Sequence, residues 1–320
     1  MKLFVTGGAG FIGSNYVRHV LGSSDDSVTV FDALTYAGNL DNLRGLDDDP
    51  RFAFVKGDIT DRDAVTAAMK GHDAVLHFAA ESHVDRSIAS PDEFVHTNCD
   101  GTNVMCDVAR TIGVERFLQV STDEVYGSIE DGSFSETDAL GPRSPYSASK
   151  AAADLIALSY HVTYDVPVLV TRSSNNFGPY QFPEKLIPLF VTNLLEGKKV
   201  PLYGDGLNVR DWCYVEDNCA GVDLVLRKGT VGEIYNVGGG NELTNRVITD
   251  TILEILGHDD SMIEYVEDRL GHDRRYSITT DRVRALGWSP QHDFREAIGA
   301  TVAWYRDNAW WWEPLKQRGS

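Results

Sequence analysis

The sequence lacks several features that mark membrane and secreted proteins. No apolar run approaches the roughly 20 residues that a membrane-spanning helix needs. The N-terminal stretch MKLFVTGGAG has no signal-peptide cleavage pattern. The four cysteines, Cys99, Cys106, Cys213 and Cys219, form no C-x-x-C pair and have no neighbouring histidine pattern. We therefore expect a cytoplasmic protein with reduced, buried thiols and no metal site.

Positive charge is also scarce. Lysine and arginine number 29 against 48 aspartates and glutamates, which gives a formal net charge of −19. A chain this acidic repels nucleic acids and anionic membranes, so we expect neither as a partner. A small anionic ligand remains compatible with the composition, because a few arginines inside a pocket outweigh the global field.

Short apolar runs alternate with helical patterns through the first half of the chain. The runs, rich in β-branched residues, lie at 3–5, 28–31, 52–55, 74–76, 117–120 and 168–171. Helical patterns include 94–112 and 148–164. Continuously apolar strands separated by helices indicate a parallel sheet covered on both faces. The predicted fold class is α/β, with a Rossmann-type doubly wound parallel sheet.

The second half has a different pattern. From about residue 178, glycine, proline and aromatic residues interrupt the alternation, as in FGPYQFPEKLIP and YNVGGGNELT. We expect a Rossmann domain over 1–177 and a smaller mixed α/β domain, mainly for substrate binding, over 178–320. Some later segments are expected to return to the main sheet.

A glycine loop follows the first expected strand and opens the first helix. In VTGGAGFIGS, Gly7, Gly10 and Gly13 have the spacing G-x-x-G-x-x-G, a variant of the dinucleotide fingerprint. Such a loop brings the backbone and the helix N-terminus close to a pyrophosphate. Asp32 ends the second strand, where a carboxylate binds ribose hydroxyls and repels a 2′-phosphate. The pattern predicts a dinucleotide site and favours NAD over NADP.

The stretch SPYSASK places a tyrosine and a lysine on one face of a helix. Tyr146 and Lys150 are four residues apart. The ammonium group of Lys150 is expected to lower the pKa of the phenol, so that a tyrosinate takes a proton from a hydroxyl group. The same spacing arises by chance on surface helices, but the N-terminal dinucleotide loop favours the catalytic interpretation.

Three polar residues follow the fifth expected strand. Thr122, Asp123 and Glu124, in VSTDEVYG, are expected at the carboxyl edge of the sheet, near a nicotinamide. Two adjacent carboxylates in a partly dry site separate their pKa values, so that one acts as an acid and the other as a base. Considered alone, the stretch is better explained as a solvated acidic turn.

Several motifs together carry a family resemblance over nearly the whole chain. They are TGGAGFIGS, DALTYAGN, FAAESHVDRSI, STDEVYGS, SPYSASK, SSNNFGPYQFPEKLIP, PLYGDG, VRDW, YNVGGGNELTN and DRLGHDRRYSI. The chain resembles the extended short-chain dehydrogenase/reductase family and, within it, the dTDP-glucose 4,6-dehydratases. The Asp123–Glu124 pair discriminates, because sugar-nucleotide epimerases that resemble this chain usually carry small or hydroxyl residues there.

The resemblance implies an NAD-dependent lyase that converts dTDP-glucose to dTDP-4-keto-6-deoxyglucose in deoxysugar biosynthesis. Tyr146, assisted by Lys150, would remove the C4 hydroxyl proton while hydride passes from C4 to NAD. Glu124 would then remove the C5 proton while Asp123 protonates the departing C6 hydroxyl, and hydride would return to C6. Thr122 would hydrogen-bond at the C4 oxygen.

The resemblance also assigns binding residues. The cofactor-binding residues are expected to be Gly7, Gly10, Phe11, Ile12, Gly13, Asp32, Ala33, Leu34, Thr35, Asp58, Ile59, Ala79, Ala80, Ser82, Thr97, Tyr146, Lys150 and Asn175. The substrate-binding residues are expected to be Ser82, His83, Thr122, Asn176, Glu184, Lys185, Leu186, Ile187, Pro201, Tyr203, Arg210, Asn245, Arg269 and His272. Asp58 also suits a helix cap, and Asn245 and Arg269 also suit a surface loop. Glu81, His83, Asp85 and Arg86 are expected to form mainly a supporting polar network.

Two other functions remain compatible with parts of the pattern. An epimerase or decarboxylase of UDP-sugars would use the same loop and Tyr–Lys pair, although Asp123 and Glu124 argue against it. A dinucleotide-sensing module without turnover would not need these four side chains. The resemblance further implies a homodimer through a four-helix bundle, built from 94–112 and 148–164 of each subunit. The nucleobase of the substrate stays open between thymidine, uridine and guanosine.

Overall fold

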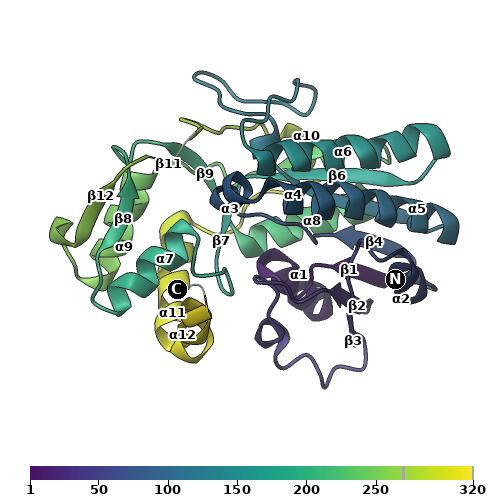
Figure 1. Cartoon of the computed structure of the whole chain (residues 1–320), viewed down its shortest axis with the longest axis horizontal. Helices are drawn as coiled ribbons and strands as arrows, with labels where there is room; N and C mark the ends of the chain where they lie inside the picture. The colour runs from purple at the N-terminus through teal and green to yellow at the C-terminus, as the bar shows by residue number, and fades with distance from the viewer. Residues whose placement is uncertain (269–270, 319–320) are drawn as a thin grey trace.

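Seven parallel strands form the main sheet of the computed structural model, which describes residues 1–268 and 271–318 (Figure 1). Their order across the sheet is β10 (Ile234–Val237), β6 (Val168–Ser173), β5 (Arg116–Thr122), β4 (Ala74–His77), β1 (Lys2–Thr6), β2 (Ser27–Asp32) and β3 (Phe52–Lys56). All six apolar runs identified in the sequence are strands of this sheet, and all its neighbouring strands pair in parallel. The predicted doubly wound α/β fold is confirmed.

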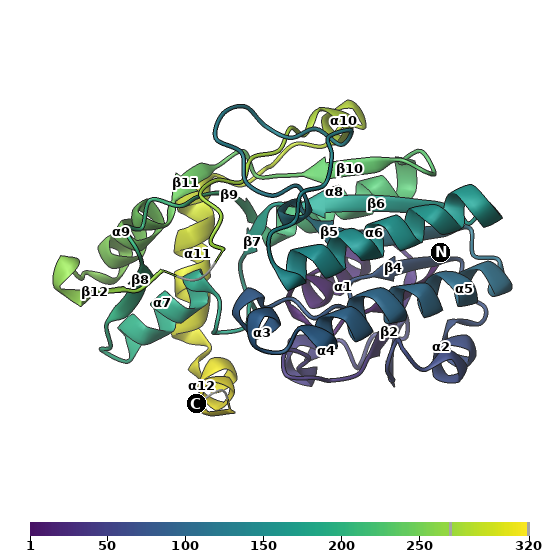
Figure 2. The same cartoon turned by 45° about the horizontal axis from the view of Figure 1, so that its top comes forward.

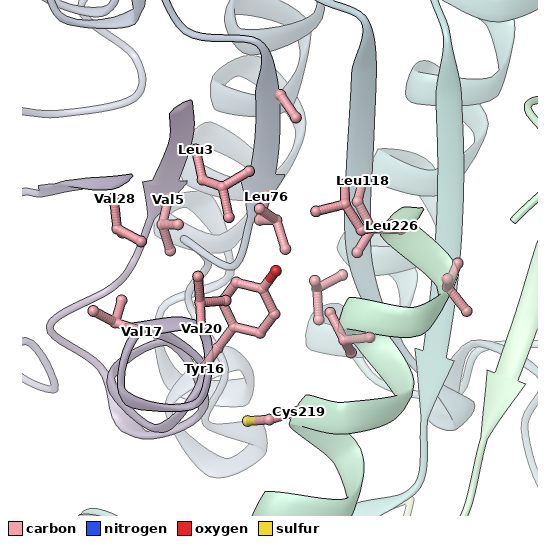
Figure 3. Packing of buried hydrophobic residues seen from close by; sticks show 14 of the residues in the cluster. Leu3, Val5, Tyr16, Val17, Val20, Val28, Leu76, Leu118, Cys219 and Leu226 are labelled. Atoms are coloured by element: carbon pink, nitrogen blue, oxygen red, sulfur yellow. The ribbon is translucent and has the colours of Figure 1, made fainter. Parts of the chain in front are cut away.

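The two faces of the main sheet each carry an apolar core. Leu3 and Val5 of β1 belong to one core (Figure 3), whereas Phe4 of β1 and Val75 of β4 belong to the other. Successive side chains of a strand point to opposite faces, so a continuous apolar run is what a doubly covered sheet requires. The covering helices are α1 (Phe11–Ser23), α8 (Val215–Lys228) and α10 (Asp281–Ala285) on the first face, and α2 (Arg62–Met69), α5 (Thr102–Ile112) and α6 (Pro145–Tyr164) on the second.

The two helices expected over 94–112 and 148–164 lie side by side on the second face (Figure 2). The first is a continuous run of α4 (Pro91–Val95), a π-helical segment at His96–Gly101, and α5. The second, α6, begins three residues earlier than expected, because Ser144 and Ser147 form a capping box at its N-terminus. This cap fixes Tyr146 in the first turn of α6 and Lys150 one turn later.

The second part of the structure contains two small sheets. One is made of β11 (Glu242–Thr244), β9 (Val209–Tyr214) and β7 (Asn175–Phe177), and the other of β12 (Ile263–Val266) and β8 (Val200–Tyr203). An aromatic-rich core joins them to α7 (Leu186–Leu195), α9 (Asn245–Leu256), α11 (Phe294–Asp307) and α12 (Ala309–Arg318). The second half of the chain also supplies α8, β10 and α10 to the main sheet. The boundary between 177 and 178 stays a prediction.

The strand order places a binding crevice. β1 lies between β2 and β4, so the chain leaves β1 toward one edge of the sheet and later returns to its other side. In open parallel sheets ligands bind at the carboxyl ends of the strands where the order reverses in this way. No helix among the described residues is long and apolar enough to cross a membrane.

Candidate active site

The glycine loop lies at the carboxyl end of β1. Gly7 has a φ of 67°, and a Cβ there would lie 2.6 Å from the backbone nitrogen of Ala79. A Cβ on Gly13 would lie 2.3 Å from the carbonyl oxygen of Gly7. Only glycine fits such positions. The loop therefore lies tightly against its neighbours, and α1 starts at its end with N–H groups that have no partner within the helix.

A cavity of about 250 Å³ adjoins this loop. The predicted cofactor residues that line it are Gly7, Gly10, Phe11, Ile12, Gly13, Asp32, Ala33, Thr35, Asp58, Ile59, Ala79, Ala80, Ser82, Thr97, Tyr146 and Lys150. Leu34 does not line the cavity, although its neighbours on both sides do, and Asn175 lines the adjoining second cavity. The cavity is also lined by Tyr36, Ala37 and Gly38 of the DALTYAGN motif and by Gln181 and Phe182, for which no cofactor contact was predicted.

Two backbone amides hold the carboxylate of Asp32. The N–H of Ala9 donates to Oδ2 at 2.9 Å, and the N–H of Leu34 donates to Oδ1 at 2.8 Å. Burial nevertheless raises the pKa of Asp32. The carboxylate lies where the ribose of a dinucleotide needs an acceptor, so the residues present fit NAD.

Asp58 lies at the same edge of this cavity. Its Oδ1 accepts hydrogen bonds from the N–H and the hydroxyl group of Thr60, at 2.8 and 2.7 Å. The residue that caps α2 is Asp61, whose side chain accepts from the N–H groups of Asp63 and Ala64. The helix-cap interpretation of Asp58 is therefore wrong, and its cofactor contact stays a prediction.

Tyr146 and Lys150 both line the first cavity. The ammonium group of Lys150 donates to the carbonyl oxygen of Val120 at 2.7 Å, and burial lowers the pKa of Lys150 to about 8. Burial, and next the charge of Glu124, raise the pKa of Tyr146, while the hydroxyl group of Thr122 acts in the opposite direction. The expectation of a lowered pKa for Tyr146 is wrong, because removal of the phenol from water raises it, and a contribution of Lys150 to this pKa stays a prediction.

The two adjacent carboxylates lie in a single turn, η3 (Asp123–Val125), directly after β5. Thr122 holds this turn: its hydroxyl donates to Oδ1 of Asp123 at 3.3 Å and accepts from the N–H of Glu124 at 3.2 Å. Asp123 is only 2% exposed, so the interpretation of this stretch as a solvated turn is wrong. Burial, and then the charge of Glu124, raise the pKa of Asp123 well above its usual range. A carboxyl group that keeps its proton can act as an acid.

A second cavity, of about 200 Å³, adjoins the first and shares Gln181, Glu184 and Lys185 with it. The predicted substrate residues that line it are His83, Asn176, Glu184, Lys185, Leu186, Ile187, Pro201, Tyr203, Arg210, Asn245 and His272, and Glu124 joins them. Ser82 lines the first cavity, Thr122 lines neither, and Arg269 lies outside the described residues. Leu202, which lies between Pro201 and Tyr203 in the strand that the resemblance assigns to the substrate, also lines this cavity. Leu189, Phe190, Trp212 and Tyr276 line it too, and no substrate role was predicted for them.

Two polar residues of the second cavity are more buried than the sequence suggested. Asn245 is the first residue of α9 and is buried, so the surface-loop interpretation is wrong for it. The guanidinium group of Arg210 donates to the carbonyl oxygens of Val209 and Asp273 at 2.7 and 2.9 Å and lies 4.2 Å above the ring of Tyr276. These contacts orient a planar cation suited to the oxygens of a diphosphate.

A polar cluster lies where the two cavities meet. His83 caps α3 (Val84–Ala89) by accepting from the N–H of Arg86 at 3.3 Å, and its Nε2 is 3.9 Å from Oε2 of Glu184. The guanidinium group of Arg86 lies 3.7 Å above the ring of Tyr36, whose hydroxyl donates to Oε1 of Glu184 at 3.2 Å. The segment quoted as FAAESHVDRSI thus links the cofactor side to the second part of the chain, as a supporting network would.

Comparison with known proteins agrees with this geometry. The family model described as GDP-mannose 4,6 dehydratase matches residues 4–301. The chain belongs to this family. A family member from Streptomyces antibioticus, a dTDP-glucose 4,6-dehydratase, is 56% identical over 325 residues, which cover 99% of this chain and 96% of that relative. The low-salt glycan biosynthesis protein Agl12 from Haloferax volcanii is 55% identical over 95% of this chain and 98% of its own length.

A crystal structure from the same family has nearly the same backbone. DesIV, the dTDP-glucose 4,6-dehydratase of Streptomyces venezuelae, was determined with NAD and thymidine diphosphate bound. It superposes with a TM-score of 0.97 at 55% sequence identity, over 98% of this chain and all of DesIV. The predicted family resemblance is confirmed.

Proposed function

We propose that this chain is a dTDP-glucose 4,6-dehydratase, an NAD-dependent lyase of deoxysugar biosynthesis. The observation that carries the proposal is the buried Asp123 beside Glu124, in a turn that follows β5 close to Tyr146. High identity over the full length of a dTDP-glucose 4,6-dehydratase supports the same conclusion. When bound in the first cavity, NAD would supply the hydride acceptor and donor that oxidation at C4 and reduction at C6 require.

Side chains of this protein would carry out the proton transfers of the reaction. We infer that Tyr146 takes the proton of the C4 hydroxyl, and that Thr122 and the charge of Lys150 stabilise the oxygen. Glu124, which lines the sugar side, would take the C5 proton once C4 is a ketone. Asp123, whose raised pKa favours the protonated form, would give its proton to the C6 oxygen as water leaves.

The second cavity would hold the nucleotide part of the substrate. Arg210 is buried, held by two carbonyl oxygens and part of the lining of this cavity, and a planar guanidinium group matches the oxygens of a diphosphate. Tyr203, half-exposed and edge-on to the ring of His272 with centroids 6.3 Å apart, suits a nucleobase. This assignment leaves the sugar at the junction with the first cavity, next to Glu124.

A substrate comparison tests the proposal. The purified protein would be incubated separately with dTDP-glucose, UDP-glucose and GDP-mannose, without added NAD, and each sugar nucleotide followed by mass spectrometry. We expect loss of one water from dTDP-glucose. Loss of water from GDP-mannose alone would overturn the substrate, and an isomerised sugar of unchanged mass would favour an epimerase.

We further infer a homodimer that works in the cytoplasm. Leu155 and Val162 lie seven residues apart on α6 and are 59% and 82% exposed, which leaves an apolar stripe beside α5. Helices with such a repeat bury it against partner helices, as in the four-helix bundle expected here. Sedimentation of the purified protein tests this: a mass of one chain at micromolar concentration would contradict the dimer.

A further inference from the structure

The C-terminal helix contacts a loop that forms one wall of the first cavity. Trp311 lies on α12 and is 2% exposed, and its indole N–H donates to Oδ1 of Asn42 at 2.7 Å. Asn42 belongs to the short helix η1 (Leu40–Leu43) and is 1% exposed. Just before η1, residues 35–38 line the cavity. The contact therefore joins the last helix of the second part to the wall of the cofactor site in the first.

Asn42 continues the contact to the glycine loop. Its Nδ2 donates to the carbonyl oxygen of Ala9 at 2.8 Å, and the N–H of Ala9 donates to Oδ2 of Asp32 at 2.9 Å. The orientation of the Asn42 amide is fixed, because an indole N–H only donates and a carbonyl oxygen only accepts. An unbroken series of hydrogen bonds thus leads from α12 to the carboxylate that suits a ribose.

Cation–ring contacts hold the same loop from both sides. The guanidinium group of Arg44 lies 4.9 Å from the ring of Trp310, the neighbour of Trp311 on α12. Arg18 of α1 donates to the carbonyl oxygens of Asn42 and Arg44 at 2.7 and 3.0 Å, and lies 5.0 Å above the ring of Tyr180. The loop is therefore held between α1 and α12.

We propose that Trp311, Asn42 and Ala9 form a clasp through which α12 retains NAD in the first cavity. The inference rests on the proposed NAD-dependent function. A dehydratase of this kind regenerates NAD in every turnover, so the dinucleotide does not need to leave the protein and bind again between turnovers. In this proposal, departure of the dinucleotide moves the cavity-lining residues 35–38 outward and thereby breaks the hydrogen bond between Trp311 and Asn42.

A pair of matched variants tests the clasp. Trp311→Phe removes the indole N–H donor to Asn42 and keeps a large aromatic ring. Trp312→Phe, on the same helix at 3% exposure, removes a donor to the carbonyl oxygen of Tyr305 at 2.7 Å, which lies within the second part. The two changes are alike in chemistry and burial, and only the first removes a contact with Asn42 of η1, which follows the cavity-lining residues 35–38.

The measurement is exchange of bound dinucleotide. Each protein is loaded with isotope-labelled NAD, mixed with excess unlabelled NAD, and the label that stays bound is followed by mass spectrometry. We expect Trp311→Phe to exchange about tenfold faster than the wild type, the effect of one buried hydrogen bond that breaks on release. Trp312→Phe should lower the melting temperature comparably and leave exchange within about twofold.

The outcomes separate the two proposals. Equal exchange rates for the two variants, or unchanged exchange in both, would overturn the clasp while leaving the dehydratase intact. Asn42→Ala combined with Trp311→Phe should exchange no faster than Asn42→Ala alone, because both changes remove one interaction; additive rates would also overturn it. A wild-type protein that binds no NAD would overturn the proposed function, and the clasp with it.

Discussion

Replacing Asp123 with asparagine separates the folding role of this residue from its chemical role. Asp123 is buried, its Oδ2 has no hydrogen-bond partner among the described residues, and burial together with Glu124 raises its pKa. Asparagine has nearly the same shape, but it neither ionises nor gives up a proton at working pH. We therefore expect Asp123→Asn to fold and to lose water elimination.

The effect on stability has a definite sign. An aspartate in an unfolded chain loses its proton near pH 3.9, whereas the folded chain keeps the proton of Asp123 to a higher pH. Between these two pKa values the folded state binds more protons, so raising the pH lowers the free energy of unfolding. Above the folded pKa, the cost is about 1.4 kcal/mol for each unit that separates the two values. Asp123→Asn does not have this cost, so its stability relative to the wild type should rise from about pH 4 upward.

Denaturant unfolding of both proteins at a series of pH values measures this difference. Asp138→Asn is the control, because Asp138 is exposed and hydrogen bonds from Ser135 lower its pKa, so its replacement should change relative stability in the opposite direction. Elimination of water by Asp123→Asn should fall about 100- to 10,000-fold, the usual contribution of a general acid. If the free energies of unfolding of Asp123→Asn and the wild type changed in parallel with pH, the conclusion that Asp123 keeps its proton when buried would be refuted. An unchanged elimination rate would refute its proton donation.

Four more substitutions address other charged groups, two in the site and two elsewhere in the structure. Glu124→Gln should still form some 4-keto hexose but lose both water elimination and exchange of the C5 hydrogen with deuterated solvent, seen by mass spectrometry; elimination at the wild-type rate would assign the base elsewhere. Oxidation at C4 by the wild type should slow above about pH 8 as Lys150 loses its charge, and Lys150→Met should be slow throughout, without this alkaline decline in a pH–rate profile. Asp154→Asn should cost about 3–5 kcal/mol in urea unfolding, because it leaves the buried guanidinium of Arg172, now 3.0 Å from the Asp154 carboxylate, without a negatively charged partner. The exposed ion pair removed by Arg295→Ala should cost less than about 1 kcal/mol, and equal costs would contradict the argument.

The main sheet could be predicted because its signal is local. Each of its first six strands contains a short, mainly apolar run, and Gly7 and Gly13 occupy positions in the loop that only glycine fits. Parallel pairing and the reversal of strand order then follow from the helices between the runs. The second part has short strands of three to six residues and pairs elements far apart, such as β8 with β12. Its topology was not readable from periodicity.

The residues that line the two cavities could be predicted only where the family resemblance gives them a role. Contiguous stretches such as residues 184–187 carried their assignment through the family resemblance. Trp212 and Tyr276 belong to the quoted motifs VRDW and DRLGHDRRYSI, but no role was predicted for them. They line the second cavity from strand β9 and from a late loop, and which way their side chains face depends on tertiary packing. The contact of Trp311 with Asn42 spans 269 positions of sequence, and neither residue belongs to a motif.

For the Tyr146–Lys150 pair, the spacing in the sequence predicted where the two side chains lie but not the direction of their pKa shifts. Their separation of four residues on a helix correctly predicted that both side chains line the first cavity. Spacing alone, however, predicts only the attraction between their charges. Burial acts on each charge separately and with the larger effect: it raises the pKa of Tyr146 and lowers that of Lys150, so both are pushed toward their neutral forms. A positive charge in the cavity that Tyr146 lines would act in the opposite direction and lower the pKa of the phenol. Bound oxidised NAD would supply such a charge, so Tyr146 would be a stronger base with the cofactor in place than without it.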